Sequence, residues 1–318
     1  MGALAAVDAE TGELYDLLAA IAPDTLVRER GGRALAVSRI QSDAIRVYTD
    51  RCFAAPEVEI PLPPGTNAHD VEIVGDTWFV SPYGQDFLLA LDATGASVGQ
   101  VDLAPWADGD ETPEPDQLVV VDGALVVALQ NLYAGFSSAG AGRLAVIDPV
   151  ALAVDRVFDV GPNPKVYAHP AEAGTVVVLT GLFSRAPEIL ADGQFATVDL
   201  VSGATTVLAL ERDLGFDLYD YAESGEHGVV VGVSFEDGSQ SRIRCLHWAT
   251  ETWTEGPASA SWYADLAPAA DGSVWVATRS GQVAGAKSGI FQLDPVTCSL
   301  LTEGPVPDLE PYSLAFLP

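Results

Sequence analysis

Residues 67–95, NAHDVEIVGDTWFVSPYGQDFLLALDATG, contain three short apolar segments separated by turn residues. The segments DVEIV, DTWFVS and FLLAL have the length of β-strands, and a Gly-Asp turn joins the first two. The third segment ends at Asp92 and is followed by Ala-Thr-Gly, which predicts another hairpin turn. This stretch therefore predicts antiparallel strands joined by tight turns.

Short apolar runs that end in Asp recur along the whole chain. Five are clear: LAAVD, LLALD, LAVID, FATVD and IFQLD; RVYTD and RCLHW are weaker copies, with His247 in the Asp place of the second. The Asp residues, with His247 in place of one of them, are at positions 8, 50, 92, 148, 199, 247 and 294. This interval is close to the roughly 40 to 50 residues of one propeller blade. The repeat therefore predicts an all-β fold, a seven-bladed β-propeller.

The strand tally leaves one strand missing where the two chain ends meet. Second strands are recognisable in six repeats, so we expect a three-stranded seventh blade, shared by about 1–20 and 308–318. In it YSLAF, residues 312–316, is the innermost strand. Closing the ring in this way leaves no exposed sheet edge. The whole chain, residues 1–318, is then a single propeller domain.

Composition limits the classes of function. The chain has 318 residues, 48% hydrophobic and 19% charged, with 15 Lys and Arg against 45 Asp and Glu. A formal charge of −30 disfavours binding to nucleic acid or to an anionic membrane surface. No apolar run reaches the roughly 18 residues of a transmembrane segment. We expect a monomer without a bound cofactor.

The three cysteines, Cys52, Cys245 and Cys298, lack the spacing of a zinc site or a redox pair. Their odd number leaves at least one thiol outside any intramolecular disulfide. A chain of this size has core enough to fold without disulfides, so we expect free thiols, with one disulfide as the alternative.

The segments LLALDATG, LAVIDPVA and LAAVDAETG resemble the repeat of YVTN-type β-propeller proteins. More narrowly, residues 67–95 and the segment from DLAPWADGDETPEPDQ to VVALQ look like a group of exported, lipid-anchored propellers from high-GC bacteria. The resemblance implies an extracytoplasmic location and supplies no catalytic residues. The sequence has no lipobox cysteine near residue 1, so a lipid anchor would belong to a precursor segment.

Loops that lead into the innermost strands of a propeller gather at one mouth of its central channel, where ligand sites are common. We expect a protein, peptide or glycan to bind there, with Lys165 as the counter-ion of Asp70 or of an anionic ligand group. An alternative is that Asn, Asp and Pro only make the turns, around a water-filled plug. The candidate ligand-binding residues are Asn67, His69, Asp70, Gln117, Asn163, Lys165, Tyr219, Trp262, Tyr263 and Tyr312.

Two long loops, 131–142 and 181–194, are further candidates, because long insertions often carry function. Tyr133, Phe136, Phe183 and Arg185 would form an apolar lip with one cation. A lid over the channel and a loop in solution are the alternatives.

The densest group of carboxylates, WADGDETPEPDQ, is a candidate calcium site with Asp108, Asp110, Glu114 and Asp116 as ligands. The match to an EF-hand loop stops after Asp110, so a solvated acidic turn is the alternative. Nucleophile-elbow and zinc-helix motifs are absent from the sequence, and the four histidines are scattered over different repeats. A non-enzymatic binding protein is the favoured reading. The alternative is a metal-dependent hydrolase of the lactonase or phosphoesterase type.

Overall fold

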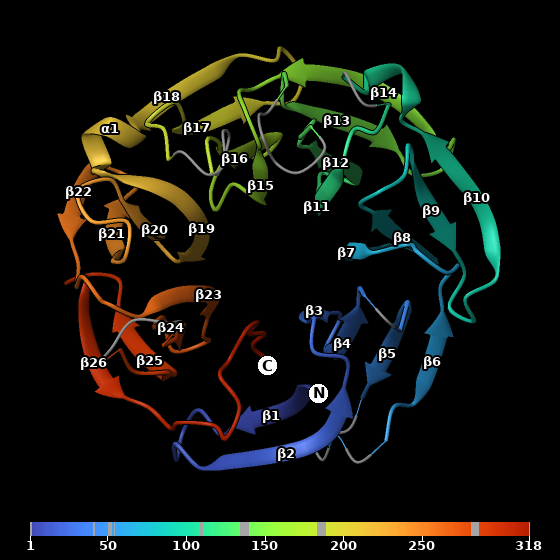
Figure 1. The fold of residues 1–318 in the computed structure, drawn as a ribbon. Helices are drawn as coiled ribbons and strands as arrows, with labels where there is room; N and C mark the ends of the chain where they lie inside the picture. The colour runs from blue at the N-terminus through green and yellow to red at the C-terminus, as the bar shows by residue number, and fades with distance from the viewer. Residues whose placement is uncertain are drawn as a thin grey trace. The chain divides into compact units, whose positions relative to one another are not determined.

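The computed structural model describes residues 2–40, 42–49, 53, 55–108, 111–133, 140–182, 189–280 and 286–317. Within these ranges the chain forms six antiparallel sheets of four consecutive strands and one sheet of two strands (Figure 1). Repeated four-stranded antiparallel sheets are the blades of a β-propeller. The all-β propeller predicted from the repeat is confirmed, with six four-stranded blades.

The chain divides into two compact units, unit 1 (Met1–Ile60 and Tyr219–Pro318) and unit 2 (Pro61–Leu218). Unit 1 contains the two-stranded sheet and three four-stranded blades, except for the last residue of β6 and the first three residues of β19. The two-stranded sheet pairs β1 (Gly2–Val7) with β2 (Leu14–Ile21). The three blades are β3 (Thr25–Arg30), β4 (Arg33–Ser38), β5 (Ala44–Tyr48) and β6 (Val58–Pro61); β19 (Phe216–Ser224), β20 (His227–Ser234), β21 (Ser241–His247) and β22 (Thr252–Glu255); β23 (Trp262–Pro268), β24 (Val274–Arg279), β25 (Gly289–Asp294) and β26 (Ser299–Glu303).

Unit 2 contains three further blades. They are β7 (Ala68–Val74), β8 (Thr77–Pro82), β9 (Phe87–Leu91) and β10 (Ser97–Asp102); β11 (Pro115–Val121), β12 (Ala124–Leu129), β13 (Arg143–Asp148) and β14 (Ala153–Asp159); β15 (Lys165–Ala168), β16 (Thr175–Leu179), β17 (Gln194–Asp199) and β18 (Thr205–Leu210). A 3-10 turn, η1 (Ala104–Trp106), follows β10, and a short helix, α1 (Glu211–Leu214), follows β18. No helix in the described ranges is long and apolar enough to cross a membrane.

The second strand of each blade is the most buried. In β16 every residue is buried, and in β12 every residue after Ala124 is buried, whereas all five residues of the fourth strand β26 are exposed. A strand covered on both faces reads as a continuous run of Val, Leu and Ala. This is why the second strands are the clearest elements in the sequence.

In four of the blades, the Asp that ends the repeat makes the turn between the third and fourth strands. Asp92 Oδ1 accepts hydrogen bonds from the backbone N–H groups of Thr94 and Ala96, at 2.8 and 3.0 Å. Asp148, Asp199 and Asp294 accept equivalent hydrogen bonds from the residues that follow them. The repeated Asp is therefore an Asx-turn residue, and its recurrence fixes where each hairpin reverses.

Adjacent blades pack through their apolar faces. In unit 2 one buried cluster joins the β7–β10 and β11–β14 sheets, with Phe79, Leu88 and Leu125 among its largest members. A second cluster joins the β11–β14 and β15–β18 sheets. In unit 1 a third cluster joins the β19–β22 and β23–β26 sheets, with Val231 and Leu293 fully buried. Each blade therefore depends on its neighbour for part of its core.

The terminal blade differs from the prediction. The two outer strands predicted from residues 1–20 are present as β1 and β2, but the described residues 304–317 form no strand, so the expected strand at 312–316 is not formed. The C-terminal segment is instead attached through side chains. Ser313 Oγ exchanges hydrogen bonds with the N–H and C=O groups of Val27 in β3, and Leu317 packs against the core formed with β1 and β2.

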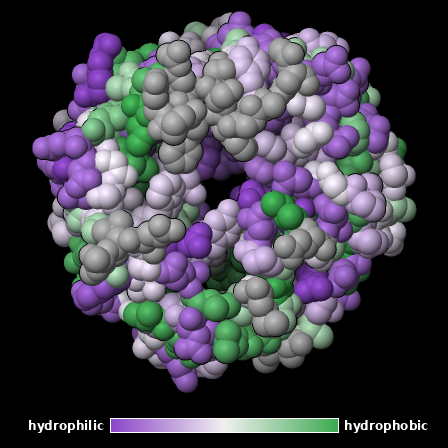
Figure 2. Space-filling view, viewed as in Figure 1, coloured by the Kyte–Doolittle hydropathy of each residue, from purple (hydrophilic) through white to green (hydrophobic). Residues whose placement is uncertain are grey.

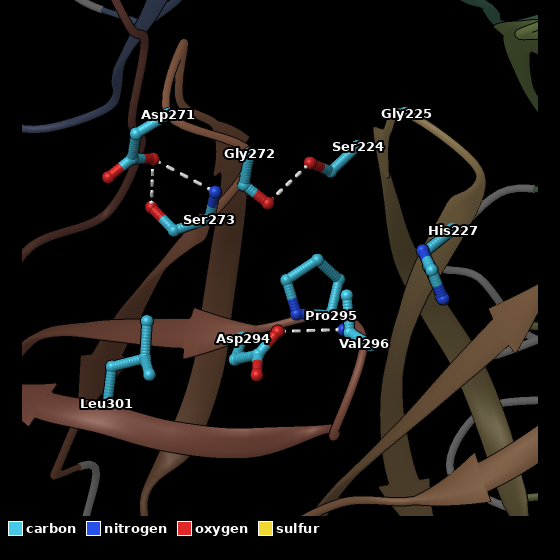
Figure 3. Close-up of a pocket in the computed structure, with 10 residues that line it drawn as sticks. All are labelled: Ser224, Gly225, His227, Asp271, Gly272, Ser273, Asp294, Pro295, Val296 and Leu301. Carbon is cyan, nitrogen blue, oxygen red and sulfur yellow. Dashed lines mark hydrogen bonds between the residues drawn. The ribbon is translucent and has the colours of Figure 1, made fainter.

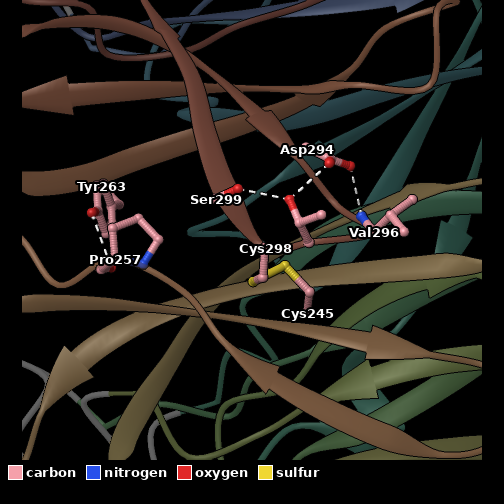
Figure 4. Close-up of a disulfide and its surroundings, with 8 residues drawn as sticks. Cys245, Pro257, Tyr263, Asp294, Val296, Cys298 and Ser299 are labelled. Carbon is pink, nitrogen blue, oxygen red and sulfur yellow. Dashed lines mark hydrogen bonds between the residues drawn. A yellow bond between two sulfur atoms is a disulfide. The ribbon is translucent and has the colours of Figure 1, made fainter.

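The expectation of free thiols is wrong for two cysteines. Cys245 in β21 and Cys298, in the turn before β26, form a disulfide between neighbouring blades of unit 1 (Figure 4). Both residues are 2% exposed and belong to the core that joins these blades. The pairing crosses 53 residues of sequence, which is why cysteine spacing does not reveal it. Cys52 lies outside the described residues.

Candidate functional site

Near the start of most innermost strands, one side chain forms a hydrogen bond with the backbone of the next innermost strand or segment. We call such a residue a bridging side chain. In unit 2, Asp70 of β7 accepts a hydrogen bond from the backbone N–H of Leu118 in β11, at 3.0 Å, and Gln117 of β11 accepts one from Val166 in β15, at 3.1 Å. Strands β7, β11 and β15 lie side by side (Figure 1). In unit 1 the bridging side chains are Asp220, Asp265 and Ser313, which accept from the backbone N–H groups of Leu266, Leu314 and Val27.

β-Bulges aim these bridging side chains. The pairing register with the second strand shifts between Ala68 and Asp70 in β7, and between Tyr263 and Asp265 in β23. A bulge inserts an extra residue and turns the side chain beside it out of the regular alternation. Asp70 is 3% exposed, so its carboxylate holds two strands together inside the protein. The structural alternative for Asp70 and Gln117 is therefore well supported.

Two bridging carboxyl groups of unit 1 lie next to each other. Burial, and then the charge and hydrogen bond of Asp220, raise the pKa of Asp265 to about 7, although Arg28 and the Leu314 N–H lower it. Two carboxyl groups in contact cannot both be ionised cheaply. We conclude that Asp265 is partly protonated at neutral pH, beside Asp220.

Three aromatic residues predicted as ligand-binding come together beside this carboxyl pair. The rings of Tyr219 and Trp262 meet edge to face, with centroids 5.2 Å apart. Burial raises the pKa of Tyr219, and the charges of Asp220, Asp265 and Tyr312 raise it further. All three side chains are half-buried. The strands β19 and β23 and the C-terminal segment therefore supply one aromatic residue each.

Two arginines surround Tyr312. Arg39, directly after β4, donates two hydrogen bonds to Asp24, at 2.7 and 3.2 Å, and one to the Tyr312 hydroxyl at 3.4 Å. The guanidinium of Arg279, at the end of β24, lies 5.3 Å from the Tyr312 ring centroid, within the range of a cation–π contact. We call Tyr219, Trp262, Tyr312, Arg39 and Arg279 the aromatic–arginine site.

Acidic groups hold the arginines of this site in place. Glu310 accepts hydrogen bonds from the N–H and the hydroxyl of Ser280, and its Oε2 lies 3.7 Å from Arg279 Nε. The Ser280 hydroxyl is the main cause that lowers the pKa of Glu310, followed by the Ser280 N–H and Arg279. The surface of the aromatic–arginine site is thus pre-ordered and nearly balanced in charge.

The two arginines were missed from the sequence. Each follows or ends a second strand, in RALAVSR and VWVATR. Two repeats with Arg at the same step were the available signal. The sequence prediction placed its candidates at the starts of the first strands and in the long loops 131–142 and 181–194, and neither set includes Arg39 or Arg279.

Two predicted residues of unit 2 belong to a polar network between neighbouring blades. His69 Nδ1 lies 2.9 Å from Asp116 Oδ1, and Asp116 Oδ2 accepts a 2.7 Å hydrogen bond from Gln130. Gln130 in turn accepts one from the Tyr83 hydroxyl at 2.7 Å, and the Tyr83 ring stacks on His69 with centroids 3.9 Å apart. The network orients the imidazole and joins the β7–β10 and β11–β14 sheets.

Asn67 and Asn163 shape the backbone before the innermost strands of unit 2. Both adopt left-handed backbone conformations, with φ of 47° and 45°, which Asn tolerates better than most residues. Lys165 begins β15 and pairs there with Leu179, while in unit 1 the hydroxyl of the buried Tyr263 donates to the carbonyl of Pro257. These contacts give the four residues places in the local structure of their own blades.

The proposed calcium ligands do not converge. Asp108 accepts hydrogen bonds from Ala141 N–H and from Arg143, and the buried Glu114 accepts from Leu132 N–H and Thr112. Asp116 is held by His69 and Gln130, and Asp110 lies outside the described residues. Among the residues that the structure describes, no three His, Cys, Asp or Glu side chains group as metal ligands. The structure thus gives no support to a calcium site.

Hydrogen bonds hold the bases of the two long loops. Asn131 has a φ of 50°, and its side chain donates to the carbonyl of Ala141, closing the base of the 131–142 loop. At the base of the 181–194 loop, Glu211 accepts hydrogen bonds from Gly193 and Leu218. Burial, and then the neighbouring Asp217, raise the pKa of Glu211 to about 9. Phe136, Phe183 and Arg185 lie outside the described residues.

The repeated sheets and their bridging side chains define a β-propeller protein. No known protein family and no curated protein matches the chain in sequence. A putative 6-phosphogluconolactonase from Bacteroides uniformis is similar in structure, with a TM-score of 0.61 and 15% identity over 92% of this chain and 87% of that one. A chain of the Mitotic Checkpoint Complex has a TM-score of 0.60 and 12% identity, covering 86% of this chain and 77% of its own.

PorZ, a surface component of the type-IX secretion system of Porphyromonas gingivalis, has a TM-score of 0.58 and 12% identity. The match covers 87% of this chain but only 41% of PorZ, so the present chain spans less than half of that protein. At these identities the likeness shows the fold alone. Membership of the YVTN-type family is not established by these comparisons.

Proposed function

We propose that this protein is a non-enzymatic β-propeller that binds a protein or peptide through the aromatic–arginine site. One observation carries the proposal: five residues from separate segments, Tyr219, Trp262, Tyr312, Arg39 and Arg279, meet on one partly exposed surface. Trp, Tyr and Arg are the residue types that dominate binding energy at protein interfaces. A glycan, which the sequence analysis also predicts as a ligand, is the alternative.

The pre-ordering of the site supports binding over a purely structural role. A structural plug would need its polar groups satisfied but would gain nothing from side chains that reach solvent. Here the three rings are half-buried, and the side chains of Arg279 and Arg39 are 41% and 17% exposed. Tyr and Trp have few rotatable bonds, so ordering these side chains on binding costs little conformational entropy. A partner would add contacts to side chains that are already oriented.

The alternative function is a hydrolase of the lactonase or phosphoesterase type. Its support is the similarity in fold to a putative 6-phosphogluconolactonase, together with the His69–Asp116 pair, an arrangement that orients a histidine for proton transfer. A screen of lactones and phosphoesters, with and without divalent cations, tests it. Turnover that is lost in the His69→Ala variant would favour this alternative.

We also propose that the whole chain is one propeller domain whose seventh blade is built from both ends. The support is the place of the C-terminal segment in unit 1: Leu314 is hydrogen-bonded to Asp265 of β23, and Ser313 to Val27 of β3. The C-terminal segment thus makes the contacts of an innermost strand, although it forms no strand itself. β1 and β2 would be the outer part of the same blade.

An extracytoplasmic location, with a lipid anchor carried by a precursor segment, is part of the proposal. Disulfides persist mainly in oxidising compartments, and the Cys245–Cys298 bridge is fully inside the protein. The similarity in fold to a bacterial surface component is consistent with it. Figure 2 shows a face coloured largely as hydrophilic, in keeping with a charge of −30.

Selection from a random peptide library displayed on phage tests the binding function. Enriched peptides, made with a fluorescent label, should bind wild type and should lose most of their affinity for Trp262→Ala and Arg279→Ala. Arg156→Ala is the matched control, because Arg156 is similarly exposed but lies in unit 2, where it pairs with Asp155. A glycan array with the same variants distinguishes the two ligand classes. Affinity unchanged in Trp262→Ala and Arg279→Ala, or no enriched peptide at all, would contradict the proposal.

A further inference from the structure

A cavity of about 360 Å³ lies in unit 1 between the β19–β22 and β23–β26 blades (Figure 3). It is lined by the β19–β20 turn, the β23–β24 turn, and the turn and strand after β25. The volume is within the range of small-ligand sites. Tyr219 is near the start of β19 and the cavity is at the end of that strand, so this cavity is separate from the aromatic–arginine site.

Two carboxylates from the β23–β26 blade stand at the cavity. Asp271 accepts hydrogen bonds from the N–H and hydroxyl of Ser273, at 2.9 and 2.6 Å, and Asp294 accepts from Val296 N–H at 2.9 Å and the Thr297 hydroxyl at 2.7 Å. These hydrogen bonds, the hydroxyl first in each case, lower the pKa of both carboxyl groups. Both are therefore ionised at neutral pH, and each carboxylate can accept further hydrogen bonds.

Apolar side chains also line the cavity. Val296 and Leu301 are 64% and 54% exposed, and in Figure 3 the Asp294 carboxylate lies between them, beside Pro295. His227 faces the cavity from β20, and its ring meets that of His247 edge to face. Ser224 donates a 2.7 Å hydrogen bond to the carbonyl of Gly272, which ties the rims of the two blades together.

We propose that this cavity binds a guanidinium or ammonium group on an aliphatic stem, as an arginine or lysine side chain carries. The charged group would lie between Asp271 and Asp294, and the stem would cover Val296 and Leu301. Such side chains bury an apolar stem while the charged end stays hydrated. A protein of charge −30 attracts cations to its surface before any contact forms.

Asp199 offers a closely matched control. It is the same residue of the repeat in the β15–β18 blade, and it accepts hydrogen bonds from Val201 and Ser202 as Asp294 does from Val296 and Thr297. The variants Asp294→Asn and Asp199→Asn therefore remove one charge each and disturb the same kind of turn. Only Asp294 lines the cavity.

Binding is measured by NMR titration at low salt with Nα-acetyl-arginine amide, and with the uncharged citrulline analogue as the comparison. We expect saturable binding of the arginine compound in the millimolar range, as for a very small ligand. It should weaken about fivefold in Asp294→Asn and stay unchanged in Asp199→Asn. Leu301→Lys, which leaves the turn intact and places a cation in the cavity, should also weaken it.

Three results would overturn the proposal. They are no saturation up to about 20 mM ligand, equal binding of the arginine and citrulline compounds, and equal weakening in Asp294→Asn and Asp199→Asn. Agmatine, which has no peptide-like groups, distinguishes the source of the ligand. Tighter binding of the acetylated amide supports a side chain within a peptide, and tighter binding of agmatine supports a free amine.

Discussion

The backbone N–H of Leu314 donates a 2.6 Å hydrogen bond to Asp265 Oδ2, which joins the C-terminal segment to β23. One residue earlier, Ser313 is bonded to Val27 of β3. Residues distant by 286 positions are thus brought into contact by the last few residues of the chain. In unit 1, the side chains of Asp265 and Ser313 thus join the C-terminal segment to β23 and β3. The side chains of Asp70 and Gln117 join innermost strands of unit 2 in the same way.

Removal of residues 308–318 should destabilise the protein severely. The deletion removes the Leu314 and Ser313 contacts, the 2.6 Å hydrogen bond from Asp308 N–H to Asp16, and the packing of Leu317. We expect a loss of several kcal/mol out of a typical total of about 5 to 15. Thermal melting of the truncated and full chains measures it. Equal melting temperatures would show that the C-terminal segment does not close the fold.

The Asp220–Asp265 pair predicts that stability falls as pH rises. The pKa of Asp265 is raised to about 7 from an ordinary value of 3.8, so between these values the folded protein holds a proton that the unfolded chain releases. The stability from this proton is complete below the unfolded pKa and is lost as pH rises through the folded one. Glu211, with a pKa of about 9, contributes with the same sign at higher pH.

Urea unfolding at pH 5 and pH 8 measures this dependence. Wild type should be less stable at pH 8, and Asp265→Asn should show a smaller difference because an amide keeps the neutral form at every pH. The Glu211→Gln variant, in unit 2, measures the contribution of Glu211 to the pH dependence separately. In strong acid the sign reverses, because the pKa values of Asp92, Asp148 and Asp199 are lowered and their hydrogen bonds are lost on protonation. A wild-type stability that rises between pH 5 and pH 8 would contradict the raised pKa of Asp265.

Asp70 should be a large contributor to stability and not to ligand binding. Asp70→Ala leaves the N–H groups of Val71 and Leu118 without their carboxylate acceptor inside the protein, which we expect to cost about 2 to 4 kcal/mol. Asp76→Ala, at an exposed turn of the same blade, should change stability by less than about 0.5 kcal/mol. The urea midpoints of the two variants give the comparison. Similar midpoints would mean that the bridging role of Asp70 is minor.

Much of the fold was predictable because each blade repeats the same local solution. The second strands are apolar throughout because they are covered on both faces, and Asp92, Asp148, Asp199 and Asp294 recur because each makes an Asx turn. Residues 312–316 have the apolar pattern of a strand, but Leu314 and Ser313 are held by side chains. Sequence pattern cannot distinguish these two modes of attachment.

The candidate site was only partly predictable for a related reason. Tyr219, Trp262 and Tyr312 were found because they lie near the starts of innermost segments, and they do come together. Asp70 and Gln117 lie at the same step of the repeat, yet bulges turn them toward the neighbouring strand. A bulge changes where a side chain points without changing its place in the repeat. The position in the repeat was therefore a better guide to location than to role.

The Cys245–Cys298 disulfide should contribute strongly to stability, because it joins two blades across 53 residues of chain. For a loop of this length the expected contribution is about 2 to 4 kcal/mol. Reduction by dithiothreitol under mildly denaturing conditions should therefore lower the melting temperature of wild type. The double variant Cys245→Ala/Cys298→Ala should melt near the reduced wild type and should not respond to dithiothreitol, which controls for effects of the reagent elsewhere. If wild type has three titratable thiols before reduction, or melts equally with and without reductant, the bridge is not formed in solution, and the argument it provides for an oxidising compartment is lost with it.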